Sequence, residues 1–249
     1  MKTQSLSENE KMELFQKWID ESAGAVFFGG AGVSTESGIP DFRSTDGLYN
    51  QKYAYPPETI ISHEFFYENT EEFYRFYRDK LLAPGIKPNV AHFKLAELEA
   101  AGKLKAVITQ NIDGLHQMAG SRNIFELHGA VSRNYCTKCH REYSAEFIMD
   151  STGVPLCECG GLIKPDVVLY NESLDDNVVN GAVKAISEAD LLIVGGTSLV
   201  VYPAAGLLRY FKGSHIVLIN RDRTAFDKNC DLVFNDSIGK ILGSIKVNG

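Results

Sequence analysis

The stretch GGAGVSTESGIPDFR, residues 29–43, directly follows an apolar run, AVFF at residues 25–28. A glycine-rich loop after a buried strand is typical of nucleotide-binding α/β proteins, because glycines let the backbone come close to phosphate. The loop does not match the dehydrogenase pattern, in which G-x-G-x-x-G precedes an acidic residue about 20 positions further on. Here Gly30 and Gly32 are followed by the next glycine only at Gly38. The stretch therefore predicts a nucleotide site that is not of the dehydrogenase type.

Further short apolar runs extend this pattern along the chain. They are AVIT at 106, IFEL at 124, VVLY at 167, LLIV at 191 and HIVLI at 215. Near-continuous runs of this kind suit strands that are buried on both faces. Helix-like segments lie between many of them, such as 91–102 and 178–189, and residues 12–19 have apolar side chains at helical spacing. The alternation predicts an α/β fold with a mostly parallel sheet and helices on both faces.

Two segments, 44–80 and 131–165, break the alternation. The first is rich in aromatic and charged residues, and the second contains most of the cysteines. We interpret both as insertions that together build a smaller lobe. The large domain is then expected to comprise residues 1–43, 81–130 and 166–249.

Composition narrows the class of protein. The 249-residue chain has 44% hydrophobic residues, which suits a globular protein. A formal net charge of −7 argues against a general nucleic-acid binder, which would need a basic face. The N-terminal residues lack the apolar core of a signal peptide, and no stretch of about 18 apolar residues predicts a membrane span. We expect a cytoplasmic protein whose thiols stay reduced.

Four of the five cysteines are clustered in two close pairs. They are Cys136, Cys139, Cys157 and Cys159. This arrangement predicts one tetrahedral zinc ion, and four thiolates leave no open position for substrate, so the zinc would be structural. A redox thiol pair is the alternative, and it would leave the other pair unexplained. His140 is a possible replacement ligand, although a surface role suits it better, and Cys230 is interpreted as a small buried residue.

Polar side chains follow several of the predicted strands. Gln110, Asn111 and Asp113 come directly after the AVIT run, where an amide and a carboxylate could clamp ribose hydroxyls or a carboxamide. They could equally cap a turn. His128 ends the IFEL run and is a candidate general base, although a structural role is possible and His116 has a similar claim.

A second glycine-containing junction lies after the LLIV run. Thr197 and Ser198 follow Gly195 and Gly196, and their hydroxyls and backbone N–H groups suit phosphate. The alternative is that they cap the next helix.

Taken together and in this order, six motifs resemble the sirtuin family of NAD-dependent protein-lysine deacylases, especially its bacterial members. The motifs are GAGVSTESGIPDFR, TQNIDGLH, ELHG, CTKC with CECGG, KPDVVLYNE and GTSLVVYPAA. The resemblance runs from about residue 10 to the C-terminus. It implies a Rossmann-like NAD-binding domain, a small zinc-binding lobe, and an enzyme that deacetylates lysine in proteins or peptides. The products would be free lysine, nicotinamide and O-acetyl-ADP-ribose.

The resemblance also assigns roles residue by residue. Gly30, Ala31, Gly32 and Thr35 would line the NAD phosphates and ribose, with Phe42 shielding the reacting ribose carbon and Arg43 facing the phosphates. Gln110 and Asn111 would hold the nicotinamide ribose, and Ile112 and Asp113 the carboxamide. Thr197, Ser198, Asn220 and Ile238 would contact the adenosine half. Val167, Val168 and Tyr170 would bind the substrate backbone by strand addition. His128 would act as the general base, with Asn111 beside it in the catalytic site.

Three departures from the family pattern leave questions open. Gly29 replaces the usual Thr and should loosen its turn, and Asn171 replaces a Gly in the peptide-side motif. Members that prefer acidic acyl groups carry Tyr-x-x-Arg, whereas here Tyr74 is followed by Tyr77 and Arg78 comes one place late. We therefore expect an acetyl preference. A protein ADP-ribosyltransferase, a deacylase for other acyl groups and a non-enzymatic NAD sensor are the alternatives; the protein substrates and the oligomeric state stay open.

Overall fold

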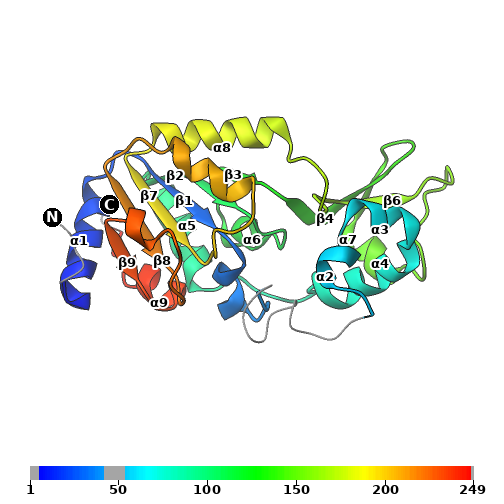
Figure 1. Cartoon of the computed structure of the whole chain (residues 1–249), viewed down its shortest axis with the longest axis horizontal. Helices are drawn as coiled ribbons and strands as arrows, with labels where there is room; N and C mark the ends of the chain where they lie inside the picture. Colours follow the sequence, from blue (N-terminus) through cyan, green and yellow to red (C-terminus); the bar gives the residue numbers. More distant parts are fainter. Residues whose placement is uncertain (1–5, 42–53, 248–249) are drawn as a thin grey trace.

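The computed structural model describes residues 6–41 and 54–247, which contain two β-sheets (Figure 1). The larger sheet consists of β1 Ala25–Gly29, β2 Leu104–Thr109, β3 Ile124–Glu126, β7 Leu191–Gly195, β8 His215–Ile219 and β9 Leu232–Phe234. Its strand order is β3-β2-β1-β7-β8-β9, and every neighbouring pair is parallel. The predicted α/β fold with a parallel sheet is confirmed.

The central strands are buried on both faces. Every residue of β1 and of β7 is buried, which explains why continuous apolar runs predicted them. The strand register places Gly29 beside Thr109 of β2 on one side and beside Gly195 of β7 on the other. The carboxyl ends of these three strands therefore lie level, and the loops that follow them gather at one edge.

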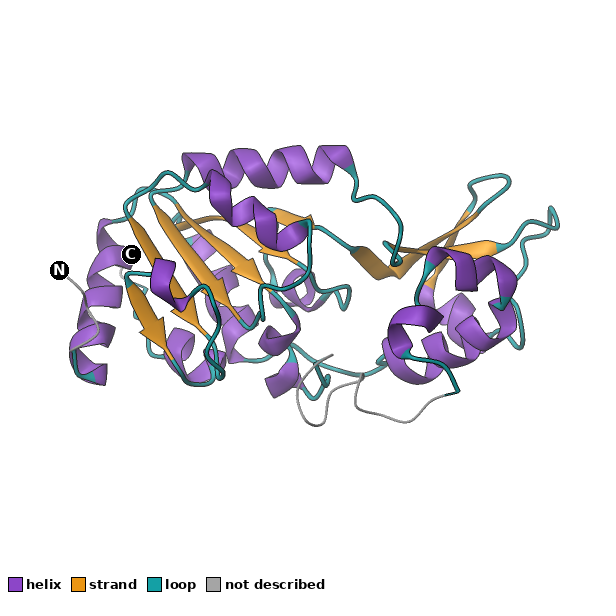
Figure 2. Cartoon of the chain, viewed as in Figure 1, coloured by secondary structure: helices purple, strands orange, loops and turns teal. Residues whose placement is uncertain are grey.

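Helices cover both faces of this sheet (Figure 2). One apolar cluster joins the sheet to α1 Glu8–Glu21, α5 Val90–Ala100 and α9 Ile238–Gly243. A second cluster on the opposite face joins it to α8 Asp176–Glu188 and the 3-10 helix η6 Ala204–Tyr210. Short helical turns lie in the loops: η2 Ala31–Val33, η3 Thr35–Ser37, α6 Leu115–Ala119 and η7 Asp227–Asn229.

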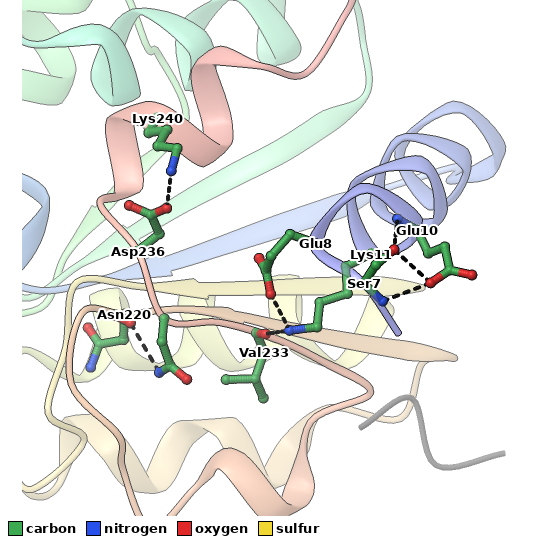
Figure 3. Close-up of polar contacts among 9 residues, drawn as sticks. Ser7, Glu8, Glu10, Lys11, Asn220, Val233, Asp236 and Lys240 are labelled. Atoms are coloured by element: carbon green, nitrogen blue, oxygen red, sulfur yellow. Dashed lines mark hydrogen bonds and ion pairs between the residues drawn. The ribbon is translucent and has the colours of Figure 1, made fainter. Parts of the chain in front are cut away.

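The predicted N-terminal helix, α1, begins with a capping box. The Ser7 hydroxyl accepts a hydrogen bond from the Glu10 N–H, and the Glu10 carboxylate accepts one from the Ser7 N–H (Figure 3). Lys11 Nζ donates to the carbonyl of Val233 at 3.1 Å, which fixes the helix to edge strand β9. Phe15, Trp18 and Ile19 of the apolar stripe are buried, as helical spacing predicted.

The smaller sheet has three antiparallel strands in the order β5-β4-β6. They are β4 Gly129–Cys136, β5 Glu142–Ser144 and β6 Ile163–Val167. Around them lie α2 Pro57–Ile60, α3 His63–Glu68, α4 Thr70–Phe76, the π-helical turn η5 Tyr77–Leu81 and α7 Ala145–Asp150. An aromatic-rich core of its own holds this part together, so the aromatic segment and the cysteine segment pack on each other. The domain boundaries themselves stay a prediction.

One strand prediction was wrong. The VVLY run at 167–170 is not a strand of the parallel sheet, because β6 ends at Val167 and pairs antiparallel with β4. Beyond that point the backbone N–H of Val168 donates to the His128 carbonyl at 3.0 Å, and that of Tyr170 donates to the Ile61 carbonyl at 2.9 Å. The run therefore links the smaller sheet to the loop that carries His128.

Within the described residues, none of the helices has the length and apolar character needed to cross a membrane.

Candidate active site and metal centre

Two glycine-containing loops meet at the carboxyl edge of the large sheet, one after β1 and one after β7. The N–H of Gly32 donates to the Gly196 carbonyl at 2.8 Å, and that of Gly30 donates to the Gly195 carbonyl at 3.3 Å. A Cβ at Gly32 would lie 2.8 Å from the Gly196 Cα, closer than real side chains come. Ala31 lies between the two glycines, at the start of η2. Only glycine allows this approach of two backbones.

The departure at Gly29 has a packing explanation. A Cβ at Gly29 would lie 2.5 Å from the Phe27 ring and 3.1 Å from Val33 Cγ2. The same ring lies 3.1 Å from the position of a Cβ on Gly195. Phe27 therefore occupies the space that a threonine at position 29 would need, and the turn is packed rather than loosened.

A chain of hydrogen bonds joins the loop after β2 to the loop after β1. Asn111 Nδ2 donates to Ser34 Oγ at 3.1 Å, and Ser34 Oγ donates to Asp113 Oδ2 at 2.6 Å. Gln110 Nε2 donates to Thr197 Oγ1 at 3.0 Å. The predicted amide and carboxylate groups thus converge on one edge. Ile112 lies between them, half-buried, and packs against the core of the smaller part.

His128 lies next to this cluster. Its Nδ1 is 2.9 Å from the Gln110 carbonyl, which can only accept, so Nδ1 carries the proton and Nε2 has a free lone pair. Burial lowers the pKa of His128 and the hydrogen bond to the carbonyl raises it, with a net pKa below the ordinary 6.5. A neutral imidazole with a free Nε2 at neutral pH is the form that a general base requires.

The residues assigned to the adenosine half differ in exposure. Thr197 is buried, and its carbonyl accepts a hydrogen bond from Asn220 Nδ2 at 3.2 Å. Ser198 is exposed. Ile238 is 4% exposed and packs against Gly195, so its side chain belongs to the core beneath the loop.

Two side chains near the loop were missed by sequence reasoning. Ser34 is the central member of the hydrogen-bond chain and is 1% exposed. Arg221, after β8, donates from Nη2 to Thr35 Oγ1 at 3.1 Å, which brings a guanidinium to the predicted phosphate loop. Arg221 follows β8 closely, but nothing in the sequence singled out this arginine. Phe42 and Arg43 lie outside the described residues.

The predicted peptide segment adjoins His128. Val167 is buried, Val168 and Tyr170 are half-buried, and the N–H of Val168 is bonded to the His128 carbonyl. Asn171 has φ of 71°, in the left-handed region where asparagine is tolerated nearly as well as the glycine of the family pattern. The backbone turn is therefore kept despite the departure.

The four cysteines form a compact cluster. Their sulfur atoms all lie within 4.8 Å of one another, with Cys136 and Cys159 3.4 Å apart and Cys139 and Cys157 3.5 Å apart. Tetrahedral zinc–thiolate bonds of about 2.3 Å place sulfurs nearly this close. The N–H groups of Lys138 and Cys139 point to Cys136 Sγ at 3.3 and 3.4 Å, an arrangement that stabilises a thiolate. The short C-x-C pair thus fits a structural zinc site, which lies in the smaller sheet and away from His128.

His116, the alternative base, belongs to a buried pair instead. Its ring lies 4.8 Å from that of His92, and both residues are at most 1% exposed. Both ring nitrogens of His116 and Nε2 of His92 have no hydrogen-bond partner among the described residues. Burial lowers the pKa of His92 to about 4, against the raising effect of Asp113, and burial together with His92 lowers that of His116 to about 3.

The histidine pair predicts loss of stability in acid. The folded-state pKa values of both histidines lie below the unfolded value near 6.5. Their contribution to the free energy of unfolding is therefore fully present above pH 6.5 and declines as the pH falls towards 4. We expect each histidine to reduce the free energy of unfolding by roughly 2 kcal/mol between pH 7.5 and 5. Urea titrations can follow this through Trp18, the single tryptophan, which lies in the large-sheet core.

His116→Phe removes one titrating group and should make the pH dependence shallower. His140→Asn is the matched control, because His140 is exposed and asparagine tolerates its positive φ of 60°. Equal unfolding free energies for the parent at pH 7.5 and 5 would contradict the prediction.

Comparison with known proteins agrees with this geometry. The Sir2 family model matches residues 30–203, which include both glycine loops, His128 and the four cysteines. The chain belongs to the Sir2 family. It is 61% identical over 241 residues to an NAD-dependent protein deacetylase of Clostridium perfringens, covering 95% of this chain and 99% of the relative. A protein of the same description from Clostridium acetobutylicum is 58% identical over 240 residues, covering 95% and 98%.

Solved Sir2 structures share the fold. One, a Sir2 variant with a deacetylated p53 peptide and 3′-O-acetyl-ADP-ribose, has a TM-score of 0.86 and 42% identity. Another, Sir2 with a p53 peptide and NAD+, has a TM-score of 0.84 and 42% identity. Each comparison covers 93% of this chain and 95% of the other. The Sir2 architecture therefore extends over nearly the whole molecule.

Proposed function

We propose that this chain is an NAD-dependent protein deacetylase, which transfers the acetyl group of a modified lysine to ADP-ribose. One observation carries the proposal: His128, with Nε2 free, lies between the Gln110 backbone and the Val168 backbone at an edge built from glycine loops. This position, between the predicted cofactor side and the predicted peptide side, supports the role of His128 as the base. The names of the relatives and the ligands of the Sir2 structures support the same reaction.

NAD, the co-substrate, supplies a ribose carbon that accepts the acetyl oxygen once nicotinamide has left. At Gly30–Gly32 and Gly195–Gly196 the absence of side chains lets the phosphates come close to the backbone of the two loops. Asn111 and Asp113 are oriented by the shared Ser34 hydroxyl, so their side chains present fixed donors and acceptors to a ribose and a carboxamide. The remaining members of the cofactor assignment are Thr35, Ile112, Thr197, Ser198 and Asn220. Ile238 supports the loop from the core beneath it, and Phe42 and Arg43 lie outside the described residues.

His128 performs the proton transfer. Its Nε2 accepts the proton of a ribose hydroxyl, which then attacks the carbon of the acetyl group. The Gln110 carbonyl holds the imidazole in the required tautomer. Val167, Val168 and Tyr170 hold the peptide alongside by strand addition. Water then supplies the remaining oxygen as the lysine amine leaves, so the products are free lysine, nicotinamide and O-acetyl-ADP-ribose.

The structure favours acetyl over acidic acyl groups. Tyr74 and Tyr77 are fully buried in the aromatic core of the smaller part. Arg78 donates to the carbonyls of Ile148 and Gly153, at 2.9 and 2.8 Å, and so fastens the end of α7. This guanidinium is thus engaged in structure and is not offered to a carboxylated acyl chain.

Mass spectrometry of the products tests both proposals. With NAD and a panel of acetyl-, succinyl- and malonyl-lysine peptides, we expect free lysine and O-acetyl-ADP-ribose from the acetyl peptide. Turnover of the acidic acyl peptides should be at least about 10-fold slower, since Arg78 is engaged elsewhere and their carboxylates would be desolvated without its charge. ADP-ribosylated protein without deacetylation would favour a transferase instead. NAD binding without any nicotinamide release would favour a sensor. We further propose the cytoplasm as its compartment, since the zinc thiols need reducing surroundings.

A further inference from the structure

A buried lysine lies behind the predicted peptide segment. Lys164 is on β6, and its side chain is only 8% exposed. Its Nζ donates to the Val167 carbonyl at 3.0 Å and to Glu172 Oε2 at 3.0 Å. A buried ammonium needs a charged partner and hydrogen bonds, and both of these partners belong to the peptide segment or its end.

Glu172 is the centre of the contacts. Besides Lys164, its Oε2 accepts from the Leu169 N–H at 2.9 Å, while Oε1 lies 2.9 Å from Nδ1 of His63. Burial raises the pKa of Glu172, but the His63 and Leu169 hydrogen bonds and the Lys164 charge outweigh it, so the carboxyl stays ionised. One carboxylate therefore connects β6, the backbone of the peptide segment and the start of α3.

The preceding residue, Asn171, makes a second contact with α3. Asn171 Nδ2 donates to Glu64 Oε2 at 2.9 Å. Between the two contacts, the His63 N–H donates to the Tyr170 carbonyl and the Tyr170 N–H donates to the Ile61 carbonyl, both at 2.9 Å. We call His63, Glu64, Lys164, Asn171 and Glu172 the loop latch.

We propose that the loop latch positions the peptide segment 167–170 for substrate, with Glu172 as its main positioning residue. This inference rests on the proposed function, in which Val167, Val168 and Tyr170 bind the substrate backbone. Strand addition requires an edge whose backbone is already extended and fixed. Segment 168–170 lies beyond the end of β6, and its backbone is paired there only locally, at Val168 with His128 and at Tyr170 with Ile61 and His63. The latch adds side-chain contacts from β6, α3 and the segment's own end, which hold these local pairings in place.

Glu172→Gln is the direct test. Glutamine keeps the shape but cannot neutralise Lys164, and its single side-chain oxygen cannot accept all the hydrogen bonds that the two oxygens of Glu172 accept. We expect the Kd of a fluorescent acetyl-lysine peptide, measured by anisotropy, to rise about 10-fold or more, since charge-assisted hydrogen bonds are lost. The Kd for NAD should stay within about threefold of the parent. Glu68→Gln is the matched control. Glu68 is an exposed glutamate on α3, the helix that Glu172 contacts, and the chemical change is the same.

If Glu172→Gln fails to fold, His63→Ala and His63→Gln test whether the latch positions the peptide segment. His63 is on the surface, so its loss should spare folding, and glutamine can still donate to Glu172. We expect weaker peptide binding in His63→Ala and recovery in His63→Gln. Unchanged peptide binding in folded Glu172→Gln, or in His63→Ala, would overturn the inference. An equal loss of NAD and peptide binding would also overturn it, because that indicates general unfolding. A parent that binds peptide but never deacetylates it would refute the proposed function and leave the latch testable by binding alone.

Discussion

His128→Ala lowers the kcat of deacetylation by about 10³-fold while leaving the Kd for NAD within about twofold, if His128 is the general base. The imidazole removes a proton in the reaction, whereas within the described part of the chain its Nδ1 is bonded to the Gln110 carbonyl. Its loss should therefore affect the chemical step more than cofactor binding. Single-turnover measurement of O-acetyl-ADP-ribose, together with NAD titration, separates the two quantities.

The pH dependence gives a second readout for the same residue. Because the pKa of His128 lies below 6.5, the base form predominates at neutral pH, and kcat/KM should fall about tenfold per pH unit once the pH drops below that pKa. The residual activity of His128→Ala should lack this acidic limb. His215→Phe is the control: His215 stacks on Trp18, 3.9 Å between ring centres, at the other end of the sheet. A His128→Ala variant as active as the parent would remove His128 from the mechanism.

The strands that the sequence predicted most directly are those whose environment is uniform. β1 and β7 are enclosed on both faces, so every position is apolar and the run is self-evident. The last strand, β9, has only three residues. So short an apolar run cannot be distinguished in the sequence from apolar residues in a loop. VVLY at 167–170 has the composition of a strand in the parallel sheet. Its side chains are apolar for another reason, because the run lies between the smaller sheet and the loop that carries His128. Composition reports burial, and it does not report which sheet a residue joins.

The same limit applies to the site. Gln110, Asn111, Asp113 and His128 could be selected because each follows a predicted strand, where parallel-sheet proteins bind ligands. Ser34 acts through Asn111, which lies 77 positions away in sequence, so only the fold reveals the contact. The loop latch is equally non-local, since His63 and Glu172 are 109 positions apart.

Gly29 illustrates a different limit. Its departure from the family pattern looked like a weakened turn, but the missing side chain makes room for the Phe27 ring. A substitution judged one position at a time can have the wrong sign when a neighbouring side chain fills the vacated space. Gly195 contacts the same ring from the adjacent strand. The three positions therefore form one packing unit, and Gly29→Thr alone would clash even though threonine is the usual family residue.

Removal of zinc should unfold the smaller sheet and leave the larger one intact. Cys136 ends β4, while Cys157 and Cys159 precede β6, so four thiolates on one ion join the two strands with a bond network worth about 10 kcal/mol. β5 has only three residues, and β4 and β6 form a narrow sheet. Without the ion, the aromatic-rich core around Phe66 and Ile163 is left to hold those strands without the cross-link between them.

Hydrogen exchange can resolve this loss by region. We expect about one zinc per purified chain by elemental analysis, and fast exchange of residues 129–136 and 163–167 after chelation. Residues 25–29 and 191–195 should stay protected, because β1 and β7 draw on a core remote from the cysteines. Cys157→Ser should reproduce the effect of chelation, whereas Cys230→Ser should bind zinc normally, since Cys230 packs against the large-sheet cluster. If the smaller sheet of the metal-free protein exchanged as slowly as before, the zinc would not be what stabilises it, and its aromatic core would have to suffice alone.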